Sequence, residues 1–268
     1  MYHNHGISIS SLRSRHFCQL HNDSRAMTES VLAYVRTGLL SGNAVMVIAG
    51  KSRLNAILRA LAQDGSDIEK HLCTQLLTLL DADEFLPLIM KDELPDREAF
   101  MTSIGVLLRD VQIRGHGSTR VYGELVNLLW SQGNARAAIR VEDYWNELMV
   151  HHEISLYCGY EIHAFNPGSY ETPLKEIARC HSDIIQSDDD RHLLEAINKA
   201  CQEVLGNSLA STLRNIGREE YGNRLPAPHR VMFWLQRNIP SSVDKVLARA
   251  RYHYEFPRLI PDANAREH

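Results

Sequence analysis

Residues 44–50, Ala-Val-Met-Val-Ile-Ala-Gly, decide the fold of this chain. Six successive apolar residues ended by a glycine are typical of a strand that is buried on both faces. Such strands occur in parallel sheets that are covered by helices on both sides. Apolar residues recur at helical spacing on either side of the run, from Met27 to Leu39 and from Leu54 to Leu61. The stretch therefore predicts a central strand of an α/β sheet.

The alternation of short apolar runs with amphipathic stretches extends outward from this strand through residue 186. Four further strands are predicted, at His16–His21, Gln75–Leu80, Thr119–Gly123 and Ile154–Cys158. Further helices are predicted at Glu84–Met90, Asp96–Val111, Glu124–Trp130, Ala135–Met149 and Thr172–Ile185. Asp23, Asp81 and Asp96 precede helices and are expected to cap them. We expect an α/β fold, a mainly parallel sheet flanked by helices, because strands that alternate with helices pair in parallel.

From residue 187 the pattern changes to helices without strands. One apolar stripe runs from Leu193 to Leu205, another from Leu209 to Ile216, and a last helix starts at Pro240. From Arg191 onward 12 Lys and Arg stand against 8 Asp and Glu, a net charge of +4, whereas the first 190 residues carry −8. We expect a flexible leader at 1–14, an α/β domain at 15–186 and a small all-α domain at 187–268.

Length and composition exclude several classes of protein. The chain has 268 residues, 44% hydrophobic and 23% charged, which is typical of globular proteins rather than disordered ones. The net charge of −4 does not favour nucleic acid as a partner. No run of about 18 uncharged apolar residues predicts a membrane span, and the N-terminus lacks the apolar segment of a secretory signal. Five widely spaced cysteines favour reduced thiols and a cytoplasmic protein.

The loop after the first strand carries no phosphate-binding motif. It reads Leu20-His-Asn-Asp-Ser-Arg25, without the glycines that let backbone N–H groups approach a phosphate, and Asp23 would repel one. The dinucleotide-binding glycine pattern and the Gly-x-Ser-x-Gly elbow of hydrolases are also missing from the sequence. We therefore expect a protein that is not an enzyme.

The first strand carries candidate metal ligands in His16-x-Cys18-x-x-His21. His16 and Cys18 share one face of a strand, since its side chains alternate, and His21 stands at its end. Imidazole and thiolate suit zinc or another soft metal. Cys158 and His181 are candidates for completing a cysteine and histidine cluster across strand ends. The alternative is a buried structural cysteine with histidines that bind the backbone.

Two glutamates stand in contexts that suggest buried polar roles. Glu124 follows a strand and begins a helix, where residues that contact ligands gather in α/β folds, although the helix dipole also favours a carboxylate there. Glu142 and Asn146 share one helix face beside apolar neighbours. A buried glutamate needs partners, and Arg120 is the expected one. A polar network between helix and sheet is favoured over a pair of catalytic carboxylates.

Several short motifs resemble one known family as a set. They are His16-Phe-Cys18, Gly38-Leu, Gly105, Arg120-Val-Tyr-Gly-Glu124, Leu129-Trp130, Glu142-x-x-Trp-Asn146, Leu156-Tyr-Cys-x-Tyr160 and Cys180-His-Ser182. Together they look like the MEDS domain, the methanogen/methylotroph, dichloromethane-repressor sensory domain, over about residues 15–186. Two departures are His21, where an aromatic residue is expected, and the lack of a recognisable DNA-binding module.

This resemblance implies a fold similar to RecA- and KaiC-like ATPases without a functional phosphate loop. It also implies a sensor of small ligands, such as simple hydrocarbon derivatives. The positions that match recurring residues of the family, and that we expect to bind ligand, are His16, Cys18, Glu124, Trp145, Cys158 and His181. The metal candidates remain His16, Cys18 and His21, and no cofactor is indicated.

The leading hypothesis is a signal-sensing regulator without enzymatic activity. Its α/β domain would bind a small ligand, and its helical domain would relay the signal to a protein partner in a signalling or transcription-regulation pathway. Two alternatives stay open. One is a degenerate RecA-like ATPase or phosphotransfer protein, and the other is a DNA-binding transcriptional regulator that uses Arg249, Arg251 and Arg258 with nearby aromatic residues. Homo-oligomer formation also stays open.

Overall fold

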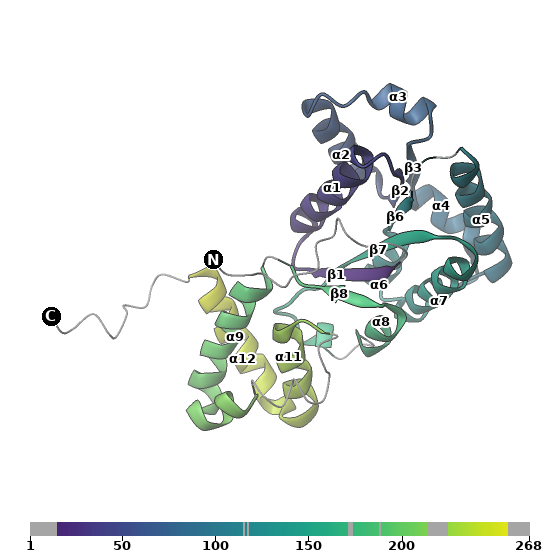
Figure 1. Cartoon of the computed structure of the whole chain (residues 1–268). Helices are drawn as coiled ribbons and strands as arrows, with labels where there is room; N and C mark the ends of the chain where they lie inside the picture. The colour runs from purple at the N-terminus through teal and green to yellow at the C-terminus, as the bar shows by residue number, and fades with distance from the viewer. Residues whose placement is uncertain are drawn as a thin grey trace. The chain divides into compact units, whose positions relative to one another are not determined.

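The chain contains a six-stranded sheet with helices on both faces (Figure 1). The computed structural model describes residues 15–114, 116, 118–170, 174–187, 189–213 and 225–256. The sheet has the order β3-β2-β6-β7-β1-β8, and each neighbouring pair is parallel. Its strands are β1 His16–His21, β2 Ala44–Ala49, β3 Leu77–Asp81, β6 Thr119–Gly123, β7 Ile154–Glu161 and β8 Asp183–Ile185. The expected α/β fold is confirmed.

The helices of this part of the chain divide between the two faces of the sheet. One face is covered by α1 Ser24–Leu40 and α2 Lys51–Gln63, whose apolar residues join those of the strands in a core around Phe17, Tyr34 and Tyr157. The other helices are α3 Ile68–Cys73, α4 Ala82–Ile89, α5 Arg97–Ile113, α6 Leu125–Ser131, α7 Ala135–His151 and α8 Leu174–Cys180. Of these, α4 to α8 cover the opposite face (Figure 1). A short antiparallel pair, β4 Met90–Lys91 and β5 Leu94–Pro95, lies between α4 and α5 in the chain.

The apolar run that predicted the central strand forms β2. All six of its residues are buried, and β3 and β6 pair with it on either side. The caps are also confirmed. Asp23, Asp81 and Asp96 accept hydrogen bonds from backbone N–H groups in the first turns of α1, α4 and α5, which otherwise lack partners.

The expected helix at Thr172–Ile185 is wrong in its second half. Helix α8 ends at Cys180, and β8 then pairs in parallel with β1, placing Ile184 beside Cys18. This strand has three residues, begins with an aspartate and is only half-buried, so no apolar run marks it in the sequence. The strand at Ile154–Cys158 is correct but continues to Glu161.

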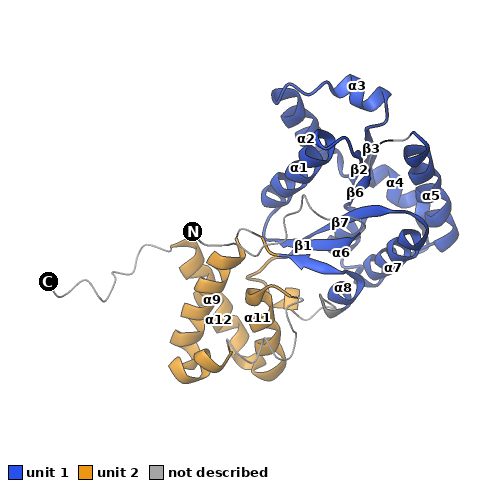
Figure 2. Ribbon diagram, in the orientation of Figure 1, with its two compact units in different colours: residues 1–162, 173–185 blue, residues 163–172, 186–268 orange. Residues whose placement is uncertain are grey.

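The chain forms two compact units (Figure 2). The first comprises residues 1–162 and 173–185, and the second comprises residues 163–172 and 186–268. The domain boundaries expected from the sequence stay predictions, and the expected leader at 1–14 lies outside the described residues.

The described part of the second unit is helical. It contains a short 3-10 turn at Pro167–Tyr170, α9 Asp190–Leu205, residues 207–213 in helical conformation, α11 Ala227–Asn238 and α12 Pro240–Glu255. Fully buried Ile197, Leu235 and Val246 show that this unit has an apolar core of its own. Among the residues described in either unit, no helix is both long and apolar enough to cross a membrane.

Candidate functional site

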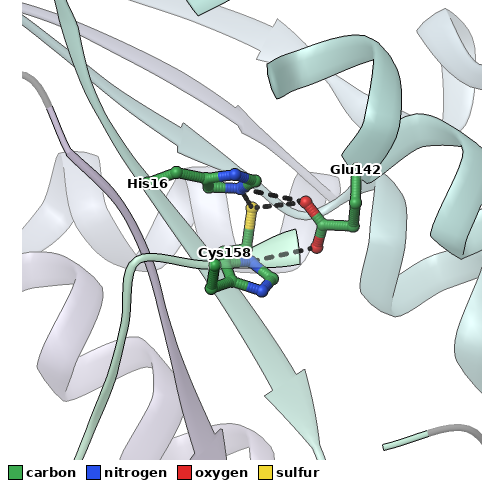
Figure 3. A group of neighbouring side chains, drawn as sticks. His16, Glu142 and Cys158 are labelled. Atoms are coloured by element: carbon green, nitrogen blue, oxygen red, sulfur yellow. Dashed lines mark hydrogen bonds and ion pairs between the residues drawn. The ribbon is translucent and has the colours of Figure 1, made fainter. Parts of the chain in front are cut away.

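Four buried side chains from separate segments meet on the face of the sheet that α7 covers (Figure 3). His16 begins β1, and Cys158 lies in the adjacent strand β7. Glu142 comes from α7, and His181 follows the last residue of α8. One donor atom from each residue can be chosen so that all four lie within 4.8 Å of one another. We call His16, Glu142, Cys158 and His181 the His/Glu/Cys cluster.

The Glu142 carboxylate is the centre of the cluster. Its Oε2 lies 3.0 Å from His16 Nε2 and 3.5 Å from Cys158 Sγ. Its Oε1 accepts a hydrogen bond from the Tyr160 hydroxyl and lies 3.3 Å from His181 Nε2. The His181 approach is within ion-pair range but is not aligned as a hydrogen bond. Glu142 has no exposed surface, so its charge is shielded from bulk water.

Both imidazoles of the cluster are oriented by the nitrogen that faces away from Glu142. His181 Nδ1 lies 2.6 Å from the backbone carbonyl of Ile177, which only accepts, so Nδ1 must carry a hydrogen. His16 Nδ1 lies 2.9 Å from Asn146 Oδ1, and Asn146 Nδ2 donates to the carbonyl of Cys180, which fixes the orientation of the amide. His16 Nδ1 is therefore also the donor. In both neutral rings the Nε2 lone pair then points toward the carboxylate.

The titration behaviour follows from close packing of these groups away from water. Burial by itself raises the pKa of Glu142, but His181 and His16 outweigh it and hold that pKa below its usual range. Burial lowers the pKa of His181, yet Cys18, Glu142 and Cys158 together raise it well above its usual value. Burial, followed by the Glu142 charge, raises the pKa of the Cys158 thiol well above normal. The cluster thus stabilises positive charge next to Glu142.

The cluster has the chemistry of a metal-binding or ligand-binding centre. Two imidazoles, a thiol and a carboxylate are ligands of zinc and of other borderline transition metals. A carboxylate and two imidazoles can also hold a small polar molecule by hydrogen bonds. Both functions depend on these four side chains remaining in place.

Cys18 lies beside the cluster. It occupies the same face of β1 as His16, because the two are two residues apart, and it stands opposite Cys158 in the register of β1 and β7. It also contributes to the raised pKa of His181. Of the residues expected to bind ligand, the structure therefore brings together His16, Cys158 and His181, with Cys18 as a neighbour.

His21, the third metal candidate, lies on the opposite face of β1. Its Nε2 is 2.9 Å from the hydroxyl of Tyr157, a residue of the core beneath α1 and α2. Burial, and then the charge of Arg53, lower the pKa of His21 to about 4, against a smaller opposing effect of Asp23. The odd spacing between His16 and His21 separates them, since side chains alternate along a strand.

Glu124 forms a second buried ion pair. Its carboxylate accepts two hydrogen bonds from the Arg53 guanidinium, at 2.9 and 2.7 Å, and one from the N–H of Gly50 at 3.0 Å. Glu124 and Gly50 follow the carboxyl ends of the neighbouring strands β6 and β2. These bonds tie the two strand ends together. Glu124, which was expected to bind ligand, therefore has a structural role in these contacts and is not part of the His/Glu/Cys cluster.

Trp145 lies in the core. Its ring meets Phe100 of α5 edge-on, with 5.2 Å between the ring centres, and it packs against Gly123 of β6. Its indole Nε1 is buried without a hydrogen-bond partner. An indole N–H in this situation is an unused donor, which a ligand can employ.

Arg120 does not pair with Glu142, so the prediction of that pair is wrong. The Arg120 guanidinium lies 5.2 Å from the centre of the Tyr34 ring, under α1, whereas Glu142 reaches the sheet from α7 on the other side. Adjacent residues of β6 face opposite sides, and only the tertiary structure shows which side α7 covers. The partners of Glu142 that the sequence did not indicate are His16, His181, Cys158 and Tyr160. Asn146, at helical spacing from Glu142, contacts His16 instead.

Comparison with known proteins identifies one family. The family model of the methanogen/methylotroph, DcmR sensory domain (MEDS) matches residues 15–182, which include all four cluster residues. No curated protein and no solved structure matches the chain. The expected likeness to RecA and KaiC therefore stays a prediction.

Proposed function

The chain belongs to the MEDS family of sensory domains, and we propose that it binds a small ligand in its first unit and relays that event to a protein partner. A sensory role follows from the family. The ligand, the relay and the partner are the parts that we add. The ligand site in this proposal is the His/Glu/Cys cluster together with Cys18 beside it and Trp145, which follows Glu142 by three residues on α7.

The observation that carries the proposal is the complete burial of the cluster within the matched domain. Taking a carboxylate and imidazoles out of water costs several kcal/mol for each ion, which good pairing only partly offsets. An apolar set of the same volume would join α7 to the sheet at least as well. Side chains of this kind, with shifted pKa values, gather preferentially at functional sites.

The position of His181 in the chain supports the relay. It belongs to the cluster and stands five residues before residue 186, where the second unit resumes. A ligand that moved His181 would act on the segment that continues into that unit. We propose that the second unit carries the contact with the protein partner.

We further propose that the protein acts without catalysis of phosphate transfer. The Asp23 carboxylate accepts the N–H of Ala26 at 2.8 Å, at the N-terminus of α1 where a phosphate loop would offer its donors. A phosphate there would meet a negative charge and an N–H group already in use. ATP at millimolar concentration is accordingly expected not to bind in equilibrium dialysis.

The charge pairing in the second unit gives little support to DNA binding. Arg249 pairs with Glu203 at 2.6 Å, and Arg251 pairs with Glu255 at 2.8 Å, so both cations already face carboxylates. Arg258 lies outside the described residues. A protein partner is the output that we favour.

The proposal is tested by thermal shift and calorimetry with the full chain. The probes are methanol, methylamine and dichloromethane, as simple one-carbon compounds, together with acetate. We expect one class to raise the melting temperature of the wild type and to have no effect on a His16→Gln variant, with a His21→Gln variant as the control on the other face of β1. Equal shifts in wild type and His16→Gln would remove the cluster from the ligand site. No shift with any probe would contradict this class of ligand.

A further inference from the structure

We propose that the His/Glu/Cys cluster holds one divalent transition-metal ion, for which zinc fits best, with His16, Glu142, Cys158 and His181 as its four ligands. The inference concerns the same site as the proposed function and adds a resident inorganic cofactor to it. It rests on three features of the cluster, namely its donor spacing, the orientation of its imidazoles and its charge.

The donor spacing is close to that of a four-coordinate site, since one donor atom from each residue lies within 4.8 Å of all the others. At ligand distances of about 2.0–2.3 Å, the corners of a tetrahedron around zinc lie roughly 3.3–3.8 Å apart. Around Glu142 the observed separations are 3.0 Å to His16 Nε2, 3.3 Å to His181 Nε2 and 3.5 Å to Cys158 Sγ. His16 Nε2 lies 3.4 Å from Cys158 Sγ. Small adjustments would bring one atom of each residue to a common centre.

The imidazoles are oriented as metal-bound imidazoles are. A histidine that ligates a metal usually donates its other N–H to a carbonyl or a carboxylate, which fixes the tautomer and the ring plane. His181 donates from Nδ1 to the carbonyl of Ile177, and His16 donates from Nδ1 to Asn146. Both Nε2 atoms are therefore left as acceptors that face the carboxylate, and the Nε2 of His181 has no hydrogen-bond partner.

With these contacts the cluster has more hydrogen-bond acceptors than donors. Its acceptors are two imidazole nitrogens and the two oxygens of Glu142. The nearest donors are the hydroxyl of Tyr160 and the thiols of Cys158 and Cys18. A positive centre between the acceptors, either protons on the imidazoles or a metal ion, would resolve this mismatch.

The charge of the ligand set matches a divalent ion. With Cys158 as thiolate and Glu142 as carboxylate, two negative charges meet two neutral imidazoles, so a bound M²⁺ gives a neutral centre. On binding, the thiol proton leaves to solvent. A neutral centre is the form that a site without exposed surface stabilises at least cost. Thiolate and imidazole also select zinc, copper or iron over magnesium and calcium.

The first experiment measures the metal content of the full chain, purified without a histidine tag, by inductively coupled plasma mass spectrometry. We expect about one zinc ion per chain in the wild type, as structural sites hold their metal through purification. Cys158→Ser and Glu142→Gln should lose it. Cys201→Ser, which changes a buried thiol of the second unit, and His21→Gln should retain it.

The second experiment follows cobalt(II) binding to the apoprotein, made by prolonged dialysis against a chelator. Tetrahedral cobalt absorbs in the visible range, and a thiolate ligand adds a charge-transfer band in the near ultraviolet. We expect both signals in the wild type and the loss of the charge-transfer band in Cys158→Ser. Asn146→Ala, which removes the acceptor for His16 Nδ1 and the donor to the carbonyl of Cys180, should weaken cobalt binding about 10- to 100-fold.

The proposal is overturned if the folded apoprotein gives no tetrahedral cobalt spectrum. It is also overturned if Cys158→Ser and Glu142→Gln keep as much metal as the wild type, since the ion would then be bound elsewhere. Circular dichroism checks that the variants fold, and the wild-type cobalt spectrum decides the matter if they do not. The proposed function has a separate test. If no metal binds but a one-carbon probe still raises the melting temperature of the wild type and not of His16→Gln, the proposed function stands without the metal.

Discussion

Two histidines at the ends of one strand have opposite environments. His16 lies 3.0 Å from the Glu142 carboxylate, whereas His21 faces the aromatic core beneath α1 and α2 and meets the Tyr157 hydroxyl. The same side chain therefore has two different roles. His16 belongs to the candidate site, and His21 is a buried neutral group that links β1 to β7.

The lowered pKa of His21 predicts a dependence of stability on pH. In the unfolded chain a histidine takes up a proton below pH 6.5, but in the folded protein His21 does so only at about 4. The folded state is thus favoured above pH 6.5, and this contribution is lost as the pH falls toward 4, by up to about 3 kcal/mol. Urea unfolding between pH 7.5 and 4.5 should show a smaller loss of stability in His21→Gln than in the wild type.

The control for this prediction is exposed His151, at the end of α7. A His151→Gln variant should follow the wild-type pH dependence, because that side chain is solvated in both states. A His21→Gln profile that coincides with the wild type would show that His21 is not kept neutral by the fold.

Single residues could be assigned to the site from sequence only where strand alternation was sufficient. It placed His16 and Cys18 on one face, and it also implies that His21 points to the other. It could not place His181, because β8 carries no apolar signal. It indicated Arg120 as the partner of Glu142, where the structure has the imidazoles of His16 and His181. The partner depends on which face of the sheet α7 covers.

At the scale of elements, the contact between α1 and β2 depends on a glycine. A Cβ added to Gly38 would lie 2.6 Å from Cγ2 of Val45 and 3.0 Å from Cδ of Arg120. Val45 belongs to the central strand and is itself buried, so it has little room to give way. The helix can approach the sheet closely only because residue 38 has no side chain.

We predict that Gly38→Ala lowers the free energy of unfolding by about 1–3 kcal/mol, the usual cost of overpacking a core. The matched control is Gly105→Ala, in the interior of α5, where an added Cβ would meet Leu148 at an ordinary 3.8 Å. That change should stabilise the protein by up to about 1 kcal/mol, since alanine favours helix more than glycine does. Chemical denaturation measures both, and equal effects would contradict the close approach.

Elements marked by a strong local signal were predicted correctly. A continuous apolar run identified β2, and aspartates marked the starts of α1, α4 and α5. The missed strand β8 has no such signal, because its three residues are stabilised by pairing with β1 rather than by their own pattern.

At the scale of the whole molecule, the two compact units each bury an apolar core. Ile57 of α2 is fully buried in the first unit, and Ile197 of α9 is fully buried in the second. Units with separate cores can open separately, and local opening is detected by hydrogen exchange.

We predict that Ile57→Ala and Ile197→Ala each lower the free energy of unfolding by about 2–5 kcal/mol. Each should reduce the protection of backbone amides against hydrogen exchange in a different region. Ile57→Ala should accelerate amide exchange in β1, β2 and β7, and Ile197→Ala should do so in α9, α11 and α12. Hydrogen exchange with mass spectrometry at peptide resolution checks both. Loss of protection across the whole chain in either variant would mean that the two units unfold as one.

The sequence by itself determined the α/β class, the caps and the family, because these depend on patterns along the chain such as apolar runs, alternation and short motifs. Only the tertiary structure decided which candidate residues form a site. His16, Glu142, Cys158 and His181 come from four segments between residues 16 and 181, and their meeting depends on strand order and on the face covered by α7. Local patterns set what each segment becomes, whereas packing of segments distant in sequence sets which side chains share a buried space.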